Sequence, residues 1–208
     1  MITFTLVAVL GVLLAMVFKQ LFRKDPPVPQ KPAEDLANLK ITDAKVGDMV
    51  SITGAGDDFG DLEFKIDRHN RYEAGEKTWV ELGGMYKDRR VYLEVMDGDE
   101  LEVSAVLHPN KLTIGDLLLS EQDLTELDQR QNTGDSFEYD GKLFYYRFSK
   151  EISVLRDGET RGTGYYMWEF REDGGNRLIT VKKGEGEPFA ASLATRVNPG
   201  DITIFRGY

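Results

Sequence analysis

One loop of the sequence, rich in glycines and carboxylates, could bind a phosphate or a cation. The stretch GAGDDFGD, Gly54–Asp61, has the glycine density of a phosphate-binding loop. It lacks the lysine and hydroxyl residue of such a loop, however, and its three aspartates would repel phosphate. The alternating ligands and the distal glutamate of a calcium loop are also missing. We therefore predict a solvated hairpin tip, with a cation loop as the alternative interpretation.

The residue types that carry most metal and nucleophile chemistry are scarce. The chain has no cysteine, which excludes disulfides, thiolate metal sites and a cysteine nucleophile. The spacing of its two histidines, His69 and His108, matches no usual ligand pattern. No Gly-x-Ser-x-Gly elbow is present either. Carboxylates alone cannot identify a general acid, so we predict no catalytic, cofactor-binding or metal-binding residue, no cofactor, and a protein that is not an enzyme.

An aromatic stretch, GTGYYMWEF at Gly162–Phe170, raises the question of a ligand platform. Alternate residues of a strand share a face, so one face would carry Tyr166, Trp168 and Phe170. Burying each of these rings is worth about 2–3 kcal/mol, which favours core packing. A stacking platform for a ligand is the alternative, and it would need exposed rings and usually a basic rim.

These elements follow an apolar N-terminal segment that predicts a membrane anchor. Residues 2–22 contain one charged residue, Lys19, and Arg23 and Lys24 follow. As a helix the segment would be about 31 Å long, which matches a hydrocarbon core of about 30 Å. Because the basic residues follow the apolar run, the positive-inside rule predicts a cytoplasmic C-terminal domain. A cleaved export signal is the rival interpretation.

The segment after the anchor is a spacer, and the remaining domain is acidic. Residues 25–40 contain four prolines, which favour an extended linker between the anchor (residues 1–24) and the domain (residues 41–208). The net charge of the chain is −10. All acidic residues lie after residue 24, and the charge there is more negative still. Nucleic-acid binding is therefore excluded, whereas cations such as polyamines would be attracted.

From Ile41 onward the pattern predicts a strand-rich fold. Short runs of β-branched and aromatic residues alternate with glycine and acidic turns, and Asp-Gly pairs predict hairpins. The predicted strands are 49–53, 61–69, 77–83, 90–96, 101–107, 136–139, 142–150, 152–156, 165–172, 177–183, 189–195 and 202–205.

One passage between these strands has the signals of a helix. Thr113 precedes Asp116 by three residues, and Ser120 precedes Asp123 by three, so each pair predicts a capping box. Asn132–Gly134 would end the segment. We predict a short helical turn and then a helix of about three turns that bridges two β halves.

The two halves share a rhythm. TWVEL and MWEF each place a tryptophan near a glutamate, and an arginine-led strand follows each of them. A degenerate internal duplication would explain this, as would the chance recurrence of antiparallel meanders. The predicted fold is mainly β (α+β), an antiparallel β-sandwich or barrel-like domain made of two similar meanders with one bridging helix.

The domain resembles an uncharacterised bacterial family, domain of unknown function 4178, from about Val46 to Phe205. Residues 57–82 follow the rhythm of the family only loosely. The resemblance is carried by VGDMV, TWVEL, VYLEV, LTIGDLLLSEQDLTELD, FEYDGKLFYYRFS, YYMWEF and NPGDITIF.

The resemblance implies no catalytic residue. It implies an accessory role beside polyamine-synthesis-like enzymes or envelope-stress proteins. We therefore expect a non-enzymatic, protein-binding scaffold at the bacterial inner membrane, held in the bilayer by residues 2–22, with membrane-associated proteins as partners. A module that binds a polycation such as spermidine is the alternative, and a carboxylate-dependent hydrolase is a third hypothesis.

Overall fold

The computed structural model describes residues 39–109 and 112–207. The predicted anchor and most of the predicted linker lie outside these residues. In the part of the chain that is described, no helix is long and apolar enough to cross a membrane.

Within the described residues the fold is an antiparallel β structure with one α-helix, as the sequence predicts. Its single difference in strand count is that the predicted strands 142–150 and 152–156 form one long strand. The strands are β1 Met49–Ile52, β2 Leu62–Ala74, β3 Lys77–Tyr86, β4 Arg89–Asp97, β5 Leu101–Val106, β6 Ser136–Tyr139, β7 Lys142–Leu155, β8 Thr163–Glu172, β9 Arg177–Gly184, β10 Ala190–Val197 and β11 Ile202–Phe205. In residues 39–109 and 112–207 the α-helix is α2, Glu121–Arg130, and the three short 3-10 helices are η1 Ile41–Asp43, η2 Asp57–Phe59 and η3 Pro199–Asp201.

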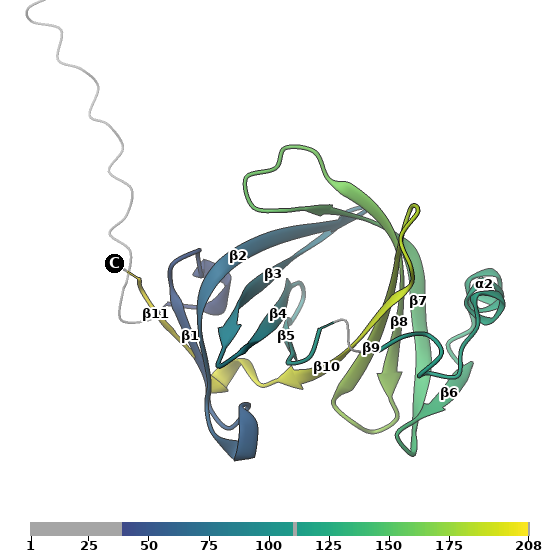
Figure 1. The fold of residues 1–208 in the computed structure, drawn as a ribbon, viewed down its shortest axis with the longest axis horizontal. Coiled ribbons are helices and arrows are strands. Elements are labelled where there is room, and N and C mark those ends of the chain that lie inside the picture. Colours follow the sequence, from purple (N-terminus) through teal and green to yellow (C-terminus); the bar gives the residue numbers. More distant parts are fainter. Residues whose placement is uncertain (1–38, 110–111, 208) are drawn as a thin grey trace, which may run out of the picture. The chain divides into compact units, whose positions relative to one another are not determined.

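Eight of the strands form a closed ring. The order is β2–β3–β4–β5–β10–β9–β8–β7, and β7 pairs with β2 again to close it. The ring therefore consists of two runs of four consecutive strands, joined by the β5–β10 and β2–β7 pairs. Figure 1 shows the first run with β1 and β11 on one side, and β7–β9 with β6 and α2 on the other.

Two bulges allow the long strands to take part in more than one pairing. The register of β2 shifts between Ile66 and Arg68, and that of β7 shifts between Tyr146 and Phe148. A bulge bends its strand and increases the local twist. Before its bulge β2 pairs with β1, and β7 pairs with β6; after the bulge β2 and β7 pair with each other.

The outer face of the ring carries two separate hydrophobic cores. Paired residues in neighbouring strands point to the same face of a sheet. Through this register, the outward residues of β3–β5 meet β1, β11 and η1, and those of β7–β10 meet α2 and the segment before it. The fully buried side chains of the first core include Ile52, Leu62, Phe64, Leu82 and Leu93, and those of the second include Leu117, Leu124, Phe144, Phe170 and Ile179.

Helix α2 begins at the predicted capping box. Ser120 Oγ accepts from the Asp123 amide at 3.2 Å, and Asp123 Oδ2 accepts from the Ser120 amide at 2.8 Å. Its 10 residues make about three turns, as predicted, and its C-cap is Gln131, just before the predicted Asn132–Gly134, in the left-handed conformation with a φ of 48°. Its buried residues are Leu124 and Leu127, which belong to the second core. Among the described residues, α2 therefore covers the second half alone and does not bridge the two.

A polar cluster fixes α2 to the strands beneath it. Asp128 Oδ1 accepts from Ser149 Oγ and from Tyr166 Oη, both at 2.5 Å, and from Gln131 Nε2 at 3.0 Å. The hydrogen bond from Ser149, and then that from Tyr166, hold the pKa of Asp128 below its ordinary value. Burial, together with the same carboxylate, raises the pKa of Tyr166 to about 12.

The depressed pKa of Asp128 predicts a pH-dependent contribution to stability. Its stabilising effect is complete above the unfolded-state value of 3.8 and is lost as the pH falls through the lower folded-state value. Asp128→Asn should therefore lower the free energy of unfolding by about 1–2 kcal/mol at pH 7. The difference in this free energy between variant and wild type should be smaller at pH 3. Urea unfolding at both pH values measures this, and an unchanged difference would contradict it.

The two tryptophans occupy different faces, although the sequence places them in similar strands. Trp79 lies opposite Tyr72 and points into the ring, where the two rings stack with centroids 5.3 Å apart. Trp168 lies opposite Ser149 on the outer face, and its Nε1 donates to the carbonyl of Leu124 at 3.0 Å. The parallel between TWVEL and MWEF therefore does not extend to equivalent positions in the ring.

Candidate ligand-binding site inside the strand ring

The inner face of the ring is polar in its middle, unlike the outer face. On β4, Glu94 alternates with the buried outward residues Leu93 and Val95. Glu94 pairs with Glu81 of β3 and Ser104 of β5, so these three side chains share the inner face. The alternation therefore places carboxylates at positions where a simple filled sheet core would carry apolar residues.

Apolar side chains close the inner space on two sides. One small cluster contains Tyr72, Trp79, Ile152, Val154 and Met167. The other contains Val106, Leu178 and Ala194. The charged residues of the inner face lie between these clusters, so they are partly shielded from water.

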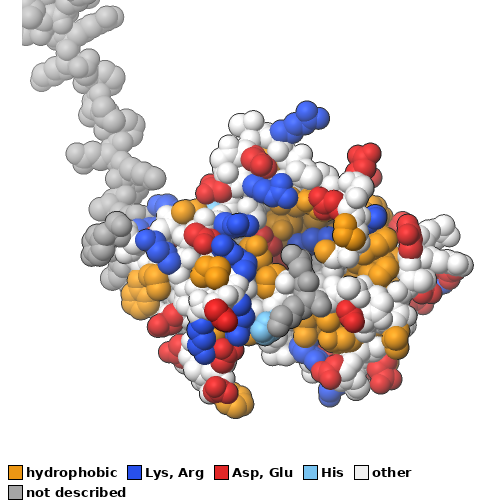
Figure 2. Space-filling view, viewed as in Figure 1, with side chains coloured by type: hydrophobic (Ala, Val, Ile, Leu, Met, Phe, Trp, Pro, Cys, Tyr) orange, Lys and Arg blue, Asp and Glu red, His pale blue; other side chains and the backbone are white. Residues whose placement is uncertain are grey.

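A cavity of about 220 Å³ lies in this inner space. Its apolar wall includes Trp79, Met96, Phe148 and Met167. Its charged wall consists of Lys77, Glu94, Glu102, Arg147, Lys150 and Glu169. Both four-strand runs of the ring contribute to the cavity. Its lining residues between Lys77 and Glu102 come from β3–β5, and those between Arg147 and Glu169 come from β7 and β8. Figure 2 shows hydrophobic and basic side chains together in the middle of the viewed face.

A hydrogen-bonded chain crosses the ring beside the cavity. Lys182 Nζ lies 3.5 Å from Glu94 Oε1 and donates to Tyr72 Oη at 3.3 Å. Tyr72 Oη donates to Glu81 Oε2 at 2.9 Å, and Asn70 Nδ2 donates to Glu81 Oε1 at 2.9 Å. Because Lys182 comes from β9 and its partners come from β2 and β4, this chain ties the two halves together.

Burial controls the protonation of this chain. It raises the pKa of Glu94, an effect that Lys182 partly offsets, and it raises the pKa of Tyr72. Burial opposes the charged form of Lys182, but Tyr72 and the two glutamates outweigh it and raise the pKa of the ammonium group. Lys182 is therefore a cation at neutral pH.

The opposite wall of the cavity holds an ion pair and a cation over aromatic rings. Arg147 Nη1 lies 3.0 Å from Glu169 Oε1, and burial raises the pKa of Glu169. Lys150 Nζ lies 4.2 Å from the Phe148 ring centroid and 5.5 Å from that of Trp79. Burial, and then the nearby Lys77, lower the pKa of Lys150. The site can therefore offer a ligand charged groups and aromatic surface together.

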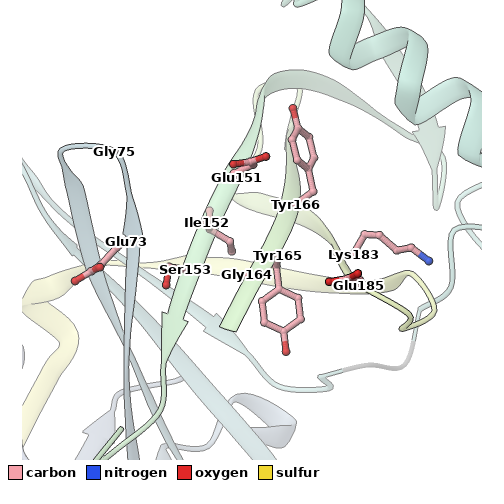
Figure 3. Close-up of a pocket in the computed structure, with 10 residues that line it drawn as sticks. All are labelled: Glu73, Gly75, Glu151, Ile152, Ser153, Gly164, Tyr165, Tyr166, Lys183 and Glu185. Carbon is pink, nitrogen blue, oxygen red and sulfur yellow. The ribbon is translucent and has the colours of Figure 1, made fainter. Parts of the chain in front are cut away.

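A second, broader recess lies where β7 ends and β8 begins. It measures about 670 Å³, and its lining includes Glu73, Glu151, Glu185, Tyr165 and Tyr166. Figure 3 shows the side chains of this recess pointing in different directions, with Tyr165 and Tyr166 on opposite sides of their strand. Its polar groups therefore do not converge on one point.

The loop Gly54–Asp61 is more ordered than the predicted solvated tip. Asp57 forms ion pairs with Arg89 and with Lys87, the latter at 2.8 Å, and its amide donates to Tyr86 Oη at 3.1 Å. The hydrogen bonds from Arg89 and then Lys87 lower the pKa of Asp57 to about 2. The tip itself is exposed, as predicted. Within the described residues, no group of His, Asp and Glu is arranged to hold a metal ion.

The aromatic stretch is core on one face, as predicted, and lines the ring on the other. Trp168 and Phe170 belong to the buried second core, and Tyr166 packs against it. The alternate residues Met167 and Glu169 line the enclosed cavity, which the sequence analysis missed. The signal in the sequence was that strands rich in apolar residues each carry a glutamate, which could have indicated a polar inner face.

The sequence of the strand ring can be compared with known protein families. The model of a domain of unknown function (DUF4178) matches residues 45–199. The chain belongs to this family. The match includes all eight strands of the ring, so the DUF4178 region contains the whole candidate site. No curated protein and no solved structure matches the chain.

Proposed function

We propose that this DUF4178 domain is a binding module for a small molecule, which it holds inside the strand ring. The enclosed cavity carries this proposal, because it combines an aromatic and methionine wall with a wall of charged groups. Ligand sites in proteins are typically concave and largely apolar, with a few placed polar groups. A volume of about 220 Å³ is smaller than the roughly 300–1,000 Å³ of pockets for drug-sized ligands, so the cavity suits a smaller ligand, of about one substituted aromatic ring.

The anchor and the cellular location remain part of the proposal. Residues 2–22 are apolar with a basic flank, which supports a single-pass anchor in the bacterial inner membrane with the domain on the cytoplasmic side. In this arrangement the domain would sense or retain a ligand near the membrane. The role as a scaffold for membrane-associated proteins stays a prediction. The hydrolase hypothesis requires close acids in a cleft, and Glu94, Glu102 and Glu169 would supply them.

Tryptophan fluorescence tests the proposal directly. In the full-length Trp168→Phe protein, held in a neutral detergent, Trp79 becomes the sole tryptophan, and it lines the cavity. We expect saturable fluorescence changes with at least one member of a panel of benzoate, phenyl phosphate, benzamide, benzylamine and spermidine. Spermidine covers the polycation alternative, for which Glu94, Glu102 and Glu169 of the cavity wall are the supporting observation.

A matched pair of variants locates the binding. Thr180 is buried and lines the cavity, whereas Thr203 is exposed on β11. Thr180→Leu adds bulk inside the cavity and should weaken binding at least tenfold, while Thr203→Leu should leave it unchanged. Circular dichroism checks that both variants fold. Equal binding by the two variants, or no saturable change with any panel member, would overturn the proposal.

A further inference from the structure

Three arginines face the inner space of the ring, although the chain as a whole is acidic. Arg147 projects from the bulge of β7, Arg171 lies on β8 and Arg196 on β10. Arg171 pairs with the inward Leu178, and Arg196 pairs with the inward Ser104, so the register directs both side chains inward. Each keeps about a third of its side-chain surface accessible, namely 37%, 34% and 36% in that order.

The carboxylates near these arginines neutralise them incompletely. Arg147 has a close partner in Glu169, at 3.0 Å. Arg171 and Arg196 share Glu102, at the longer distances of 3.9 Å and 3.4 Å. Three guanidinium groups therefore face two carboxylates. Their mutual repulsion adds to the effect of burial, which is the main cause of the lowered pKa of Arg171.

The hydrogen bonding of Arg171 is also incomplete. Its Nε and Nη2 atoms are buried, and in the described part of the chain no atom accepts a hydrogen bond from either of them. A buried donor without an acceptor costs free energy, most of all on a charged group. A guanidinium is a planar fork that matches the oxygens of a carboxylate or phosphate, so an anion is the natural complement of this cluster.

We propose that the cluster of Arg147, Arg171 and Arg196 binds the anionic group of the ligand, a carboxylate or a phosphate, and that the ligand is a small organic anion. This inference rests on the proposed function. Arg147 and Glu102 also line the enclosed cavity, which connects the cluster to the apolar wall of Trp79 and Phe148. The anionic group would lie against the arginines, and the apolar part would lie against that wall.

The panel of ring compounds tests the charge of the ligand. Benzoate and phenyl phosphate carry an anionic group, benzamide is neutral and benzylamine is a cation, while all four share one aromatic ring. We expect the two anions to bind at least tenfold more tightly than benzamide and benzylamine. Whichever of benzoate and phenyl phosphate binds more tightly then shows whether the site prefers a carboxylate or a phosphate. Raising the chloride concentration should weaken the binding of both anions.

Two variants should change the binding of the anions in opposite directions. Arg171→Met removes the fork and should weaken binding about tenfold or more, which is the effect of losing a charged hydrogen bond. Glu102→Gln removes the competing carboxylate and should tighten binding several-fold. A merely structural ion cluster would give no such gain. Arg161→Met, at an exposed position in the connection after β7, is the matched control and should bind as the parent does.

The possible outcomes separate the two proposals. Tighter binding of the anions, weakened by Arg171→Met and strengthened by Glu102→Gln, supports the inference. Equal or tighter binding of benzamide or benzylamine overturns the inference and leaves the proposed function standing. Binding of no panel member overturns both. If Arg171→Met does not fold, Arg171→Lys keeps the charge without the fork, and undiminished anion binding by that variant also overturns the inference.

Discussion

Phe170→Ala should lower the free energy of unfolding by about 3–5 kcal/mol, because it opens a cavity in the second core. Phe170 is completely buried, and its ring meets Phe137 edge-on with a centroid distance of 4.9 Å. A second edge contact, at 6.0 Å, joins it to Tyr146. The side chain thus touches both β6 and β7, and its loss should loosen the attachment of the β6 hairpin as well as the core.

Phe59→Ala is the matched control for this variant. The side chain of Phe59 is 94% exposed at the tip of the Gly54–Asp61 loop, so its removal should change stability by less than about 0.5 kcal/mol. Urea unfolding of both variants, followed by far-UV circular dichroism, gives the comparison. A loss below about 1 kcal/mol for Phe170→Ala would mean that the aromatic face of β8 is not a packed core.

The local elements of the fold could be predicted because their signals lie within a few residues. The Ser120–Asp123 capping box sets the start of α2, and the Thr113–Asp116 pair forms the same hydrogen bonds around a turn. At the β6–β7 turn, Asp140 and Gly141 both have positive φ values, of 55° and 67°. A tight two-residue hairpin requires this geometry.

The closure of the ring could not be predicted, because it depends on pairings between distant segments. The β2–β7 pair joins Tyr72 to Val154, and the β5–β10 pair joins Ser104 to Arg196. Nothing within either strand specifies its distant partner. Alternation along a strand shows that its two faces differ, but it does not show which face lies inside a closed ring.

The candidate site was missed for the same reason. Glu81, Glu94, Glu102 and Glu169 come from four strands, and only the closed register brings them to one inner face. In the sequence they look like the solvent-facing residues of ordinary half-buried strands. The exposed tip at Gly54–Asp61 was predicted, but the ion pairs of Asp57 were not, because its partners Lys87 and Arg89 lie about thirty residues further along the chain.

Asp48 joins the start of the domain to its C-terminal end. The residue is 2% exposed, and it precedes β1. Its Oδ2 accepts from the Lys45 amide at 2.9 Å and from Arg206 Nη1 at 2.5 Å, and its Oδ1 accepts from the Gly207 amide at 3.0 Å. One buried carboxylate therefore holds the backbone on both sides of the β1–β11 pair.

Asp48→Ala should lower the free energy of unfolding by about 3 kcal/mol, because it removes the acceptor of two amides and the buried carboxylate that pairs with the Arg206 guanidinium. Hydrogen exchange should show faster opening of β11 first, since that strand pairs with β1 alone among the described strands. The exposed Asp88, in the turn after β3, provides the matched control as Asp88→Ala. Equal stability of the two variants would show that this buried carboxylate does not hold the C-terminal strand.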